Sequence, residues 1–160
     1  MLEVPLDQAW KNKYPEQIVF VVSQDQQGRP NIMVAGWFVP LSGEPPLVGV
    51  ALAEERYSLQ LILETKEFVI AFPSEDMAQE VLVCGTKSGR NIDKFKETNL
   101  NRLPARKVNV PLIYGCVVNF ECRLVEDVPV GDHVLLVGEI LTAHIFEQDK
   151  RRLYNFGNLQ

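Results

Sequence analysis

The sequence predicts a mainly β protein, an antiparallel barrel or sandwich that carries a few short helices. Three observations lead to this fold class. Runs of β-branched and aromatic residues recur along the chain and end at turn signals. The connections between the early runs are too short for the crossovers that parallel strands require. Segments that begin with helix-starting residues are few and brief, so helices are expected only at the periphery.

Four apolar runs predict the strands of the first half of the chain: residues 17–24, 32–39, 47–52 and 67–72. The first run ends at Asp25-Gln26-Gln27-Gly28, which is a turn signal, and the last ends at Pro73. Gly36 lies in the middle of the second run. A glycine inside a strand marks a bulge or a place where another group approaches the backbone closely.

Two short helices are predicted next, at residues 59–65 and from residue 75 to about residue 83. Ser58 and Ser74 precede them, and a serine hydroxyl can accept an unpaired backbone N–H of the first helical turn. The chain from residue 85 to residue 111 is polar and irregular, and one helical turn is expected within it at residues 91–96.

Three further strands are predicted in the last third of the chain: residues 114–128, 133–147 and 153–156. The first of them alternates, so that one face carries Cys116, Val118, Phe120, Cys122 and Leu124 and the other carries Asn119, Glu121 and Arg123. The turn Pro129-Val130-Gly131-Asp132 joins it to the second strand, which contains Gly138.

Composition limits the classes of function. A chain of 160 residues, 46% of them apolar, matches one domain that spans residues 1–160. A net charge of −5 disfavours nucleic acid as a partner. No window approaches 18 uninterrupted apolar residues, so no membrane-spanning helix is predicted. The first residues lack the basic start and apolar core of a signal peptide, and a cytoplasmic protein is therefore expected.

The sequence contains no pattern typical of a metal site or of a catalytic nucleophile. The three cysteines Cys84, Cys116 and Cys122 have no CxxC spacing, which argues against a disulfide framework and a structural zinc site. His133 and His144 lie at an odd separation in one predicted strand, so they face opposite sides and cannot share a metal. We expect no metal site, and the chain has no Ser-His-Asp spacing, HExxH or GxGxxG.

The segment from Cys84 to Phe95 is the most distinctive one, because it carries a local charge of +2 in an acidic protein. Two glycines free the backbone to present N–H groups, and Thr86 and Ser88 add hydroxyl donors. These are the ingredients of a phosphate cradle. The segment is not a Walker A loop, because Thr86 and Val81 stand where that motif needs glycines. A solvated basic loop is the alternative reading.

Arg56 lies two residues before the expected helix cap Ser58 and defines a second candidate site. A guanidinium beside the positive end of a helix dipole attracts anions. The alternative is an ordinary turn in which Arg56 pairs with a nearby glutamate. Trp37 and Tyr57 are aromatic residues that could flank a planar ligand, although an aromatic residue in a strand more often belongs to a core or an interface.

Taken in order, these stretches resemble the flavin reductase-like family, the FMN-binding split barrels that include flavoredoxins. The motifs that carry the resemblance span nearly the whole chain: Gly28-Arg29-Pro30-Asn31, Ala35-Gly36-Trp37, Arg56-Tyr57-Ser58, Cys84-Gly85, Ser88-Gly89-Arg90, Asp93-Lys94-Phe95 and Gly131-Asp132-His133. Each motif alone is weak, but their order and spacing make the match specific.

The resemblance implies a mainly β fold, a six-stranded antiparallel split barrel with short peripheral helices, and a homodimer that binds FMN near the subunit interface. The residues expected along the isoalloxazine are Asn31, Ala35 and Trp37. Those expected at the ribityl-phosphate are Arg56, Tyr57, Ser58, Ser88, Gly89 and Lys94, and Cys84 belongs to the same cofactor-binding set. The two stretches suited to anions, found from composition alone, agree with this placement.

The activity implied is that of an NAD(P)H-dependent flavin reductase, in which nicotinamide passes hydride to flavin N5 and the protein orients the cofactor. His133 is a candidate contact on the nicotinamide side, or simply a histidine at the start of a strand. Two alternatives remain open. One is a flavoredoxin-like carrier that keeps its FMN and exchanges electrons with a protein partner. The other is a flavin-binding module without redox chemistry.

Overall fold

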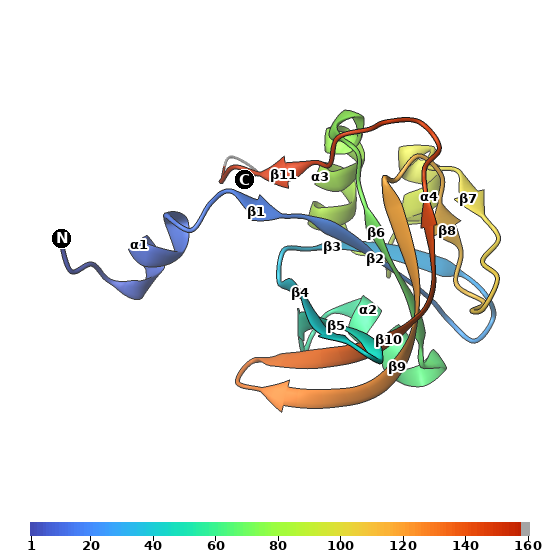
Figure 1. The fold of residues 1–160 in the computed structure, drawn as a ribbon, viewed down its shortest axis with the longest axis horizontal. Coiled ribbons are helices and arrows are strands. Elements are labelled where there is room, and N and C mark those ends of the chain that lie inside the picture. Colours follow the sequence, from blue (N-terminus) through green and yellow to red (C-terminus); the bar gives the residue numbers. More distant parts are fainter. Residues whose placement is uncertain (158–160) are drawn as a thin grey trace.

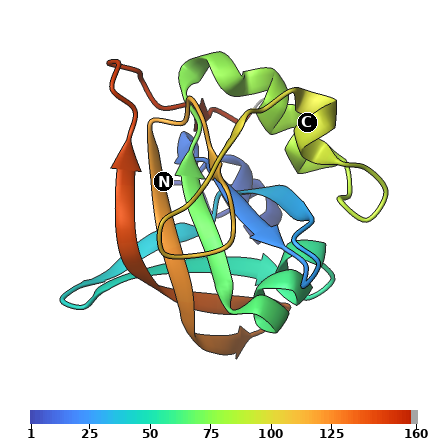
Figure 2. The same ribbon diagram turned by 90° about the vertical axis from the view of Figure 1, so that its right-hand side faces the viewer.

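A curled antiparallel sheet forms the body of the protein (Figures 1 and 2). The computed structural model describes residues 1–157. Its main sheet has seven strands in the order β3-β2-β6-β9-β10-β5-β4. The strands are β2 (Val19–Gln24), β3 (Pro30–Ala35), β4 (Phe38–Gly43), β5 (Pro46–Ala53), β6 (Glu67–Phe72), β9 (Val118–Val130) and β10 (His133–Ile145). The predicted fold class, a mainly β split barrel with short helices, is confirmed.

The predicted count of six strands was one too low, because the expected strand at residues 32–39 is two strands. The backbone breaks at Gly36 and Trp37, where the Phe38 N–H donates to the Gly36 carbonyl at 3.0 Å. The Glu16 side chain lies against this break, since a Cβ on Gly36 would meet its Oε1 at 2.9 Å. The strands on either side, β3 and β4, are the two edges of the sheet, so the break carries the chain from one edge to the other.

The helices expected at residues 59–65 and 75–83 are present, and the helical turn expected at residues 91–96 lies at residues 94–98. The prediction of Ser58 as a cap was wrong, whereas Ser74 does hold the cap position but makes no capping hydrogen bond. The helices are α1 (Leu6–Lys11), α2 (Tyr57–Thr65), the 3-10 turn Glu75–Met77, α3 (Ala78–Thr86) and α4 (Lys94–Thr98). Ser58 lies inside α2, whose cap is Arg56. The Ser74 hydroxyl makes no cap bond and donates toward the Gly115 carbonyl at 3.1 Å. The Asp93 carboxylate does cap α4, because it accepts the Lys96 N–H at 3.2 Å.

Short strand pairs complete the fold. β1 (Glu16–Gln17) pairs with β11 (Tyr154–Asn155), which lies within the predicted strand at residues 153–156, and β7 (Arg102–Leu103) pairs with β8 (Leu112–Ile113). Helix α1 was not predicted from the sequence, and it projects from the body at the N-terminal end (Figure 1). No helix among residues 1–157 is long and apolar enough to cross a membrane.

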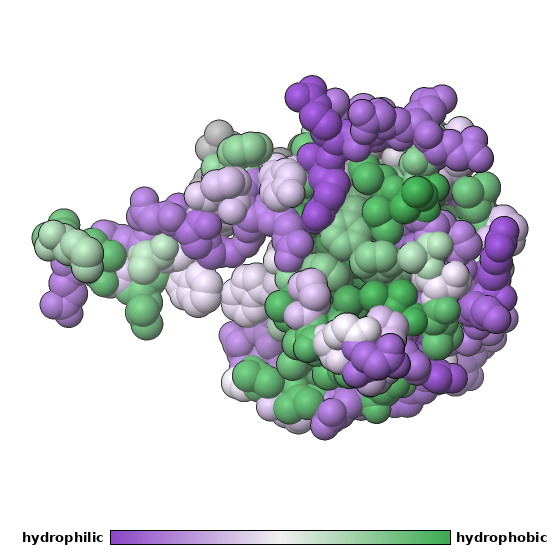
Figure 3. Space-filling view, viewed as in Figure 1, coloured by the Kyte–Doolittle hydropathy of each residue, from purple (hydrophilic) through white to green (hydrophobic). Residues whose placement is uncertain are grey.

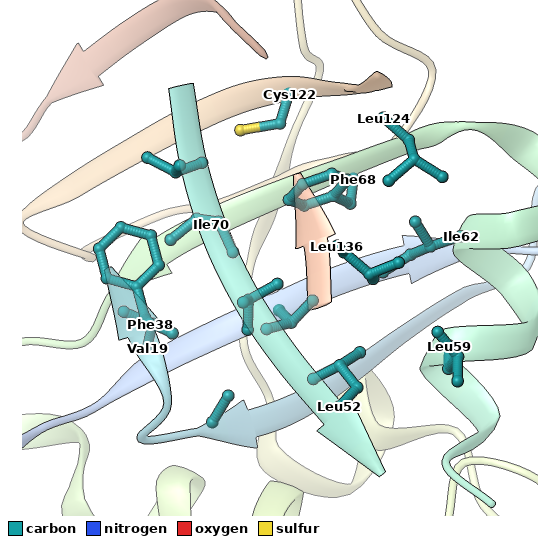
Figure 4. Packing of buried hydrophobic residues seen from close by; sticks show 14 of the residues in the cluster. Val19, Phe38, Leu52, Leu59, Ile62, Phe68, Ile70, Cys122, Leu124 and Leu136 are labelled. Carbon is teal, nitrogen blue, oxygen red and sulfur yellow. The ribbon is translucent and has the colours of Figure 1, made fainter. Parts of the chain in front are cut away.

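Two hydrophobic cores lie on opposite faces of the sheet. The first fills the barrel and includes Phe68, Ile70 and Leu136 (Figure 4). The second lies between the sheet and α3 and α4, and includes Phe20 and Phe95. The sheet is therefore buried on both faces along β2, which explains why that strand is a continuous apolar run.

Cys116 does not share a face with Cys122 and Leu124, contrary to the alternation expected from the sequence. β9 begins only at Val118, so Cys116 lies before the strand and packs in the second core. Cys122 and Leu124 face the interior of the barrel. The alternation of side chains between the two faces therefore holds only within β9, from Val118 onward.

Glu121 is a fully buried carboxylate that fastens an irregular segment to β9. It accepts the backbone N–H groups of Arg106, Lys107 and Val108 at 2.9, 2.6 and 3.1 Å, and His144 Nε2 lies 2.6 Å from it. Burial by itself would raise the pKa of Glu121, but these hydrogen bonds outweigh burial and hold the pKa below its ordinary value. Glu121 thus holds the backbone at residues 106–108, and a second carboxylate, Glu67, accepts from Asn109 further along the same loop.

We predict that Glu121→Gln lowers the free energy of unfolding at pH 7 by about 2–4 kcal/mol, because an amide cannot accept from all these donors. A carboxylate with a depressed folded-state pKa stabilises the fold at neutral pH, and that contribution disappears as the pH falls through the folded-state pKa. Urea unfolding at pH 7 and at about pH 3 is therefore expected to show a difference that shrinks in acid. Glu126→Gln, on the exposed part of β9, is the control, and an equal effect of both variants would refute the assignment.

Candidate functional site

A cavity of about 210 Å³ lies where β3, the start of α2 and the segment between α3 and α4 meet. We call it the loop cavity. It brings together most of the residues singled out in the sequence: Asn31, Arg56, Tyr57, Ser58, Cys84, Ser88, Gly89 and Lys94. The two anion-suited stretches, Arg56-Tyr57-Ser58 and the segment around Ser88, are far apart in the chain and face the same space.

A second hollow, of about 180 Å³, adjoins the loop cavity at the end of β3. It is lined by Ala35, Trp37 and His133, the remaining predicted residues, and we call it the strand-end hollow. Both spaces share Met33, Val34 and Arg56 as lining residues. All the predicted site residues therefore border one continuous region beside the edge strand β3.

A buried pair of polar side chains lies at the floor of the loop cavity. The Asn31 amide nitrogen donates to the Ser58 hydroxyl at 2.8 Å, and these residues are 4% and 1% exposed. A hydroxyl that accepts one bond keeps its proton for a second partner. Asn31 Oδ1 is buried and has no hydrogen-bond partner among the described residues. A buried acceptor without a donor is costly, which indicates that a ligand or water completes this site.

The backbone at Gly89 packs closely against the Asn31 side chain. A Cβ placed on Gly89 would lie 1.9 Å from Asn31 Oδ1, which is a severe overlap. Only glycine allows the backbone to approach the amide this closely. The loop that carries Ser88 and Arg90 is thereby held at the edge of β3.

Lys94 is buried and ties two parts of the cavity wall together. Its ammonium donates to the carbonyls of Ile32 on β3 and Cys84 on α3, each at 2.7 Å. Burial is the main cause that lowers the pKa of Lys94, and Arg56 acts in the same direction. Two of its three donors are used by the protein, so the residue is both a structural tie and a cation lining the cavity.

Two guanidinium groups stand at the rim. Arg56 is half-exposed, and the distance to its nearest carboxylate, Glu55, is 3.9 Å, so it is only weakly paired. Arg90 lies over the Tyr57 ring at 4.6 Å from the ring centroid and also lines the cavity. Arg90 was not among the residues expected at the cofactor, although the motif Ser88-Gly89-Arg90 contains it.

Three other cations of the chain lie outside the loop cavity or are already paired. Arg29 pairs with Asp25 at 2.6 Å in the β2–β3 turn, and the backbone of Lys107 is bound by Glu121. Lys87 lines the cavity but pairs with Glu97. Arg56, Arg90 and Lys94 therefore supply most of the positive charge that a ligand in the loop cavity would meet.

Aromatic rings form a stack at the outer side of the strand-end hollow. The Trp37 ring lies 5.7 Å from the Trp10 ring and 4.6 Å from the His133 ring. His133 Nδ1 lies 2.6 Å from the Asp132 carboxylate, which fixes the orientation of the imidazole. Trp10 had no place in the sequence-based interpretation, because the helix that carries it was not expected.

Cys84 lines the loop cavity as a neutral thiol. Burial raises its pKa to about 11, and the nearby Lys94 offsets this only in part. A thiol of this kind is not nucleophilic at neutral pH. Among residues 1–157, no group of three or more His, Cys, Asp or Glu side chains is placed to hold a metal ion.

A mainly β fold with one curled antiparallel sheet and short helices is the fold of the split-barrel flavin reductases. The chain belongs to the family described as the flavin reductase like domain, whose model matches residues 11–160. This family is one of flavin-binding proteins, and the resemblance stated from the sequence motifs is confirmed.

Individual relatives agree with this assignment. An uncharacterized protein of Archaeoglobus fulgidus is 44% identical over 128 residues, which are 80% of this chain and 71% of that protein. The flavoredoxin of Desulfovibrio vulgaris is 30% identical, with a TM-score of 0.78 over 84% of this chain and 72% of its own. An FMN-binding protein from Thermus thermophilus is 25% identical, with a TM-score of 0.86 over 100% of this chain and 92% of its own.

We predict that Gly89→Ala displaces the loop and lowers the free energy of unfolding by about 1–3 kcal/mol, because the new methyl group overlaps Asn31. Thermal unfolding measures the loss, and faster amide exchange around residues 86–91 locates it. Gly43→Ala is the matched control, since a Cβ at Gly43 meets nothing within 4 Å. Equal melting temperatures for the two variants would show that the approach to Asn31 is not tight.

Proposed function

We propose that the protein binds FMN, with the phosphate in the loop cavity and the ring toward the strand-end hollow, and that it is an NAD(P)H-dependent flavin reductase. The observation that carries this proposal is the convergence of hydroxyl groups, cations and a glycine-tight loop on one cavity. The protein as a whole is acidic, with a net charge of −5. A local group of cations that suits an anion therefore needs a specific explanation.

The residues present suit a phosphate monoester carried on a polyol. Arg56 and Arg90 offer charged donors, and Ser58 offers a buried hydroxyl whose oxygen already accepts from Asn31. Asn31, which the resemblance placed along the isoalloxazine, lines the loop cavity, so we propose that its unpartnered Oδ1 accepts from a ribityl hydroxyl. The site therefore fits the tail of FMN by its donors as well as by its charge.

The strand-end hollow suits the flat end of the same ligand. Ala35 is small and Trp37 is a planar ring, and both lie in the hollow that adjoins the loop cavity. Val34 borders both spaces and adds an apolar wall. The placement of the ring along Ala35 and Trp37 stays a prediction.

FMN, when bound, supplies a group that accepts hydride, so the protein needs no acid, base or nucleophile of its own. The side chains described above bind the phosphate and orient the ligand. His133 is proposed to contact nicotinamide, because it lines the hollow beside Trp37 and Asp132 fixes its ring. The description of the family as flavin reductase like supports a nicotinamide donor.

We also propose that the protein is a homodimer. The edge strand β4 exposes Val39 and Leu41, and the neighbouring Trp37 is 45% exposed. Exposed apolar residues on a free sheet edge favour association with another chain. The dimer and the flavin are separate proposals with separate tests.

The second candidate is an electron carrier that keeps its FMN and passes electrons to a redox protein. The similarity to the flavoredoxin of Desulfovibrio vulgaris, at 30% identity, favours it. The two candidates share the flavin site and differ only in the electron donor and acceptor.

We predict that the purified protein is yellow and that added FMN raises its rate of NADH or NADPH oxidation. Visible absorption measures bound flavin, and loss of absorbance at 340 nm measures oxidation of the nicotinamide. A yellow protein that neither nicotinamide reduces would favour the carrier. A colourless protein that does not bind added FMN would exclude both candidates.

We predict that Arg56→Gln weakens binding of FMN about tenfold or more, because a charge-assisted bond to the phosphate is lost. Binding of riboflavin, which has no phosphate, is expected to change little. Arg123→Gln is the matched control, because Arg123 pairs with Glu139 on the exposed side of the sheet. Quenching of flavin fluorescence measures both ligands. Equal losses for FMN and riboflavin would place the phosphate elsewhere.

A further inference from the structure

The N-terminal arm, residues 1–13, is an apolar segment that the body of the protein leaves uncovered. Its helix α1 has no buried residue. Leu6 and Trp10 are four residues apart within α1 and so lie on one side of the helix, and Leu2 precedes it. Leu2, Leu6 and Trp10 are 86%, 79% and 55% exposed. A helix of six residues is unstable in water without a surface to pack on.

The arm is fixed at its root and then leads away from its own body. Trp10 stacks on Trp37 at 5.7 Å, and Lys13 pairs with Glu16 at the start of β1. Beyond this root, the helix extends outward without touching the barrel (Figures 1 and 3). The leucines of the arm are therefore held where another molecule can meet them.

A second uncovered apolar surface lies beside that root. We call it the β4 wall, and it consists of Trp37, Val39 and Leu41, which are 45%, 46% and 44% exposed. β4 is an edge of the sheet, so one side of the strand is free of partners within the main sheet. An exposed apolar edge strand is a surface that folded proteins normally cover.

These two surfaces on one chain favour a second copy of the same chain as the occupant. In an arrangement with twofold symmetry, each arm covers the wall of the other copy, so both exposed surfaces are buried together and the assembly closes. The charges of the arm argue against a lipid surface. Its side chains Glu3, Asp7, Lys11 and Lys13 balance, whereas helices that bind anionic membranes carry a basic face.

We infer that the N-terminal arm is exchanged between two copies, so that Leu2 and Leu6 of each copy lie on the β4 wall of the other. The β4 wall includes Trp37, which lines the strand-end hollow, so the exchanged arm becomes part of the border of that hollow. This inference rests on the homodimer proposed above and is independent of the flavin.

The first test compares variants of the full chain by sedimentation equilibrium. The arm variant, Leu2→Glu with Leu6→Glu, is expected to weaken self-association at least tenfold. The wall variant, Val39→Glu, is expected to weaken it likewise. The control, Glu3→Gln with Asp7→Asn, changes only polar residues of the same arm and is expected to associate as the wild type does. Circular dichroism confirms that each variant is folded.

The second test mixes the arm variant with the wall variant. In a mixed dimer, the intact arm of the wall variant meets the intact wall of the arm variant, so one of the two contacts is restored. The mixture is therefore expected to associate more strongly than either variant alone. A mixture no stronger than its components would overturn the exchange, because an arm that covers its own wall cannot be rescued by another chain.

The outcomes distinguish the arm exchange from the homodimer proposal, on which it rests, and from the flavin proposal. An arm variant as dimeric as the wild type would overturn the exchange and leave the dimer standing, and a monomeric wild type would overturn both. Binding of the wild-type protein to phosphatidylserine vesicles, lost in the arm variant while association persists, would also overturn the exchange. Flavin content, read from the same samples, tests the flavin proposal separately.

Discussion

The candidate site depends on one buried cation. Lys94 donates to the carbonyl of Ile32 on the edge strand β3 and to the carbonyl of Cys84 near the end of α3. A buried ammonium is costly unless its donors are bonded, and here two strong acceptors meet it. The acceptor on α3 lies in the last turn, where the helix dipole also favours positive charge. Since α3 leads directly into the loop of Ser88 and Gly89, this tie places that loop against the strand that carries Asn31. The main role of Lys94 is therefore to hold the cavity wall together, and its positive charge toward a ligand is an additional role.

Most of the architecture could be predicted from the sequence because each strand buries its own pattern of side chains. The continuous apolar run of β2 reflects burial on both faces, and the clear alternation of β9 reflects two different surroundings. The details that failed depend on contacts distant in the chain. The break at Gly36 requires the Glu16 carboxylate, which the local sequence does not reveal. Serine is a residue type that caps helices, but the Ser58 hydroxyl accepts from the Asn31 amide, and the helix begins at Tyr57, two residues earlier than predicted.

In the candidate site too, some features could be predicted from the sequence and others depend on contacts distant in the chain. The order of the motifs predicted that distant stretches share one site, and Arg56 and Ser88 do border one cavity although 32 positions separate them in the sequence. The sequence could not show that Asn31 Oδ1 would be left without a partner, nor that Gly89 would approach it so closely. Both are consequences of tertiary packing. Trp10 could not be predicted for another reason. Its helix is too short and too exposed to show the spacing of buried apolar residues that predicts a helix.

The two ends of the site have different physical characters, and this difference bears on how one fold can serve reductases and carriers alike. The loop cavity is bonded internally through Asn31, Ser58 and Lys94, so it is a rigid place suited to hold the same ligand tail in every case. The strand-end hollow is lined by Trp37, a half-exposed ring on which the exposed Trp10 ring stacks. Under the proposed function, a nicotinamide or a protein partner would approach at that end. A change in the arm or in the β4 wall would then act on the approach of the electron donor and leave the proposed phosphate site in the loop cavity intact.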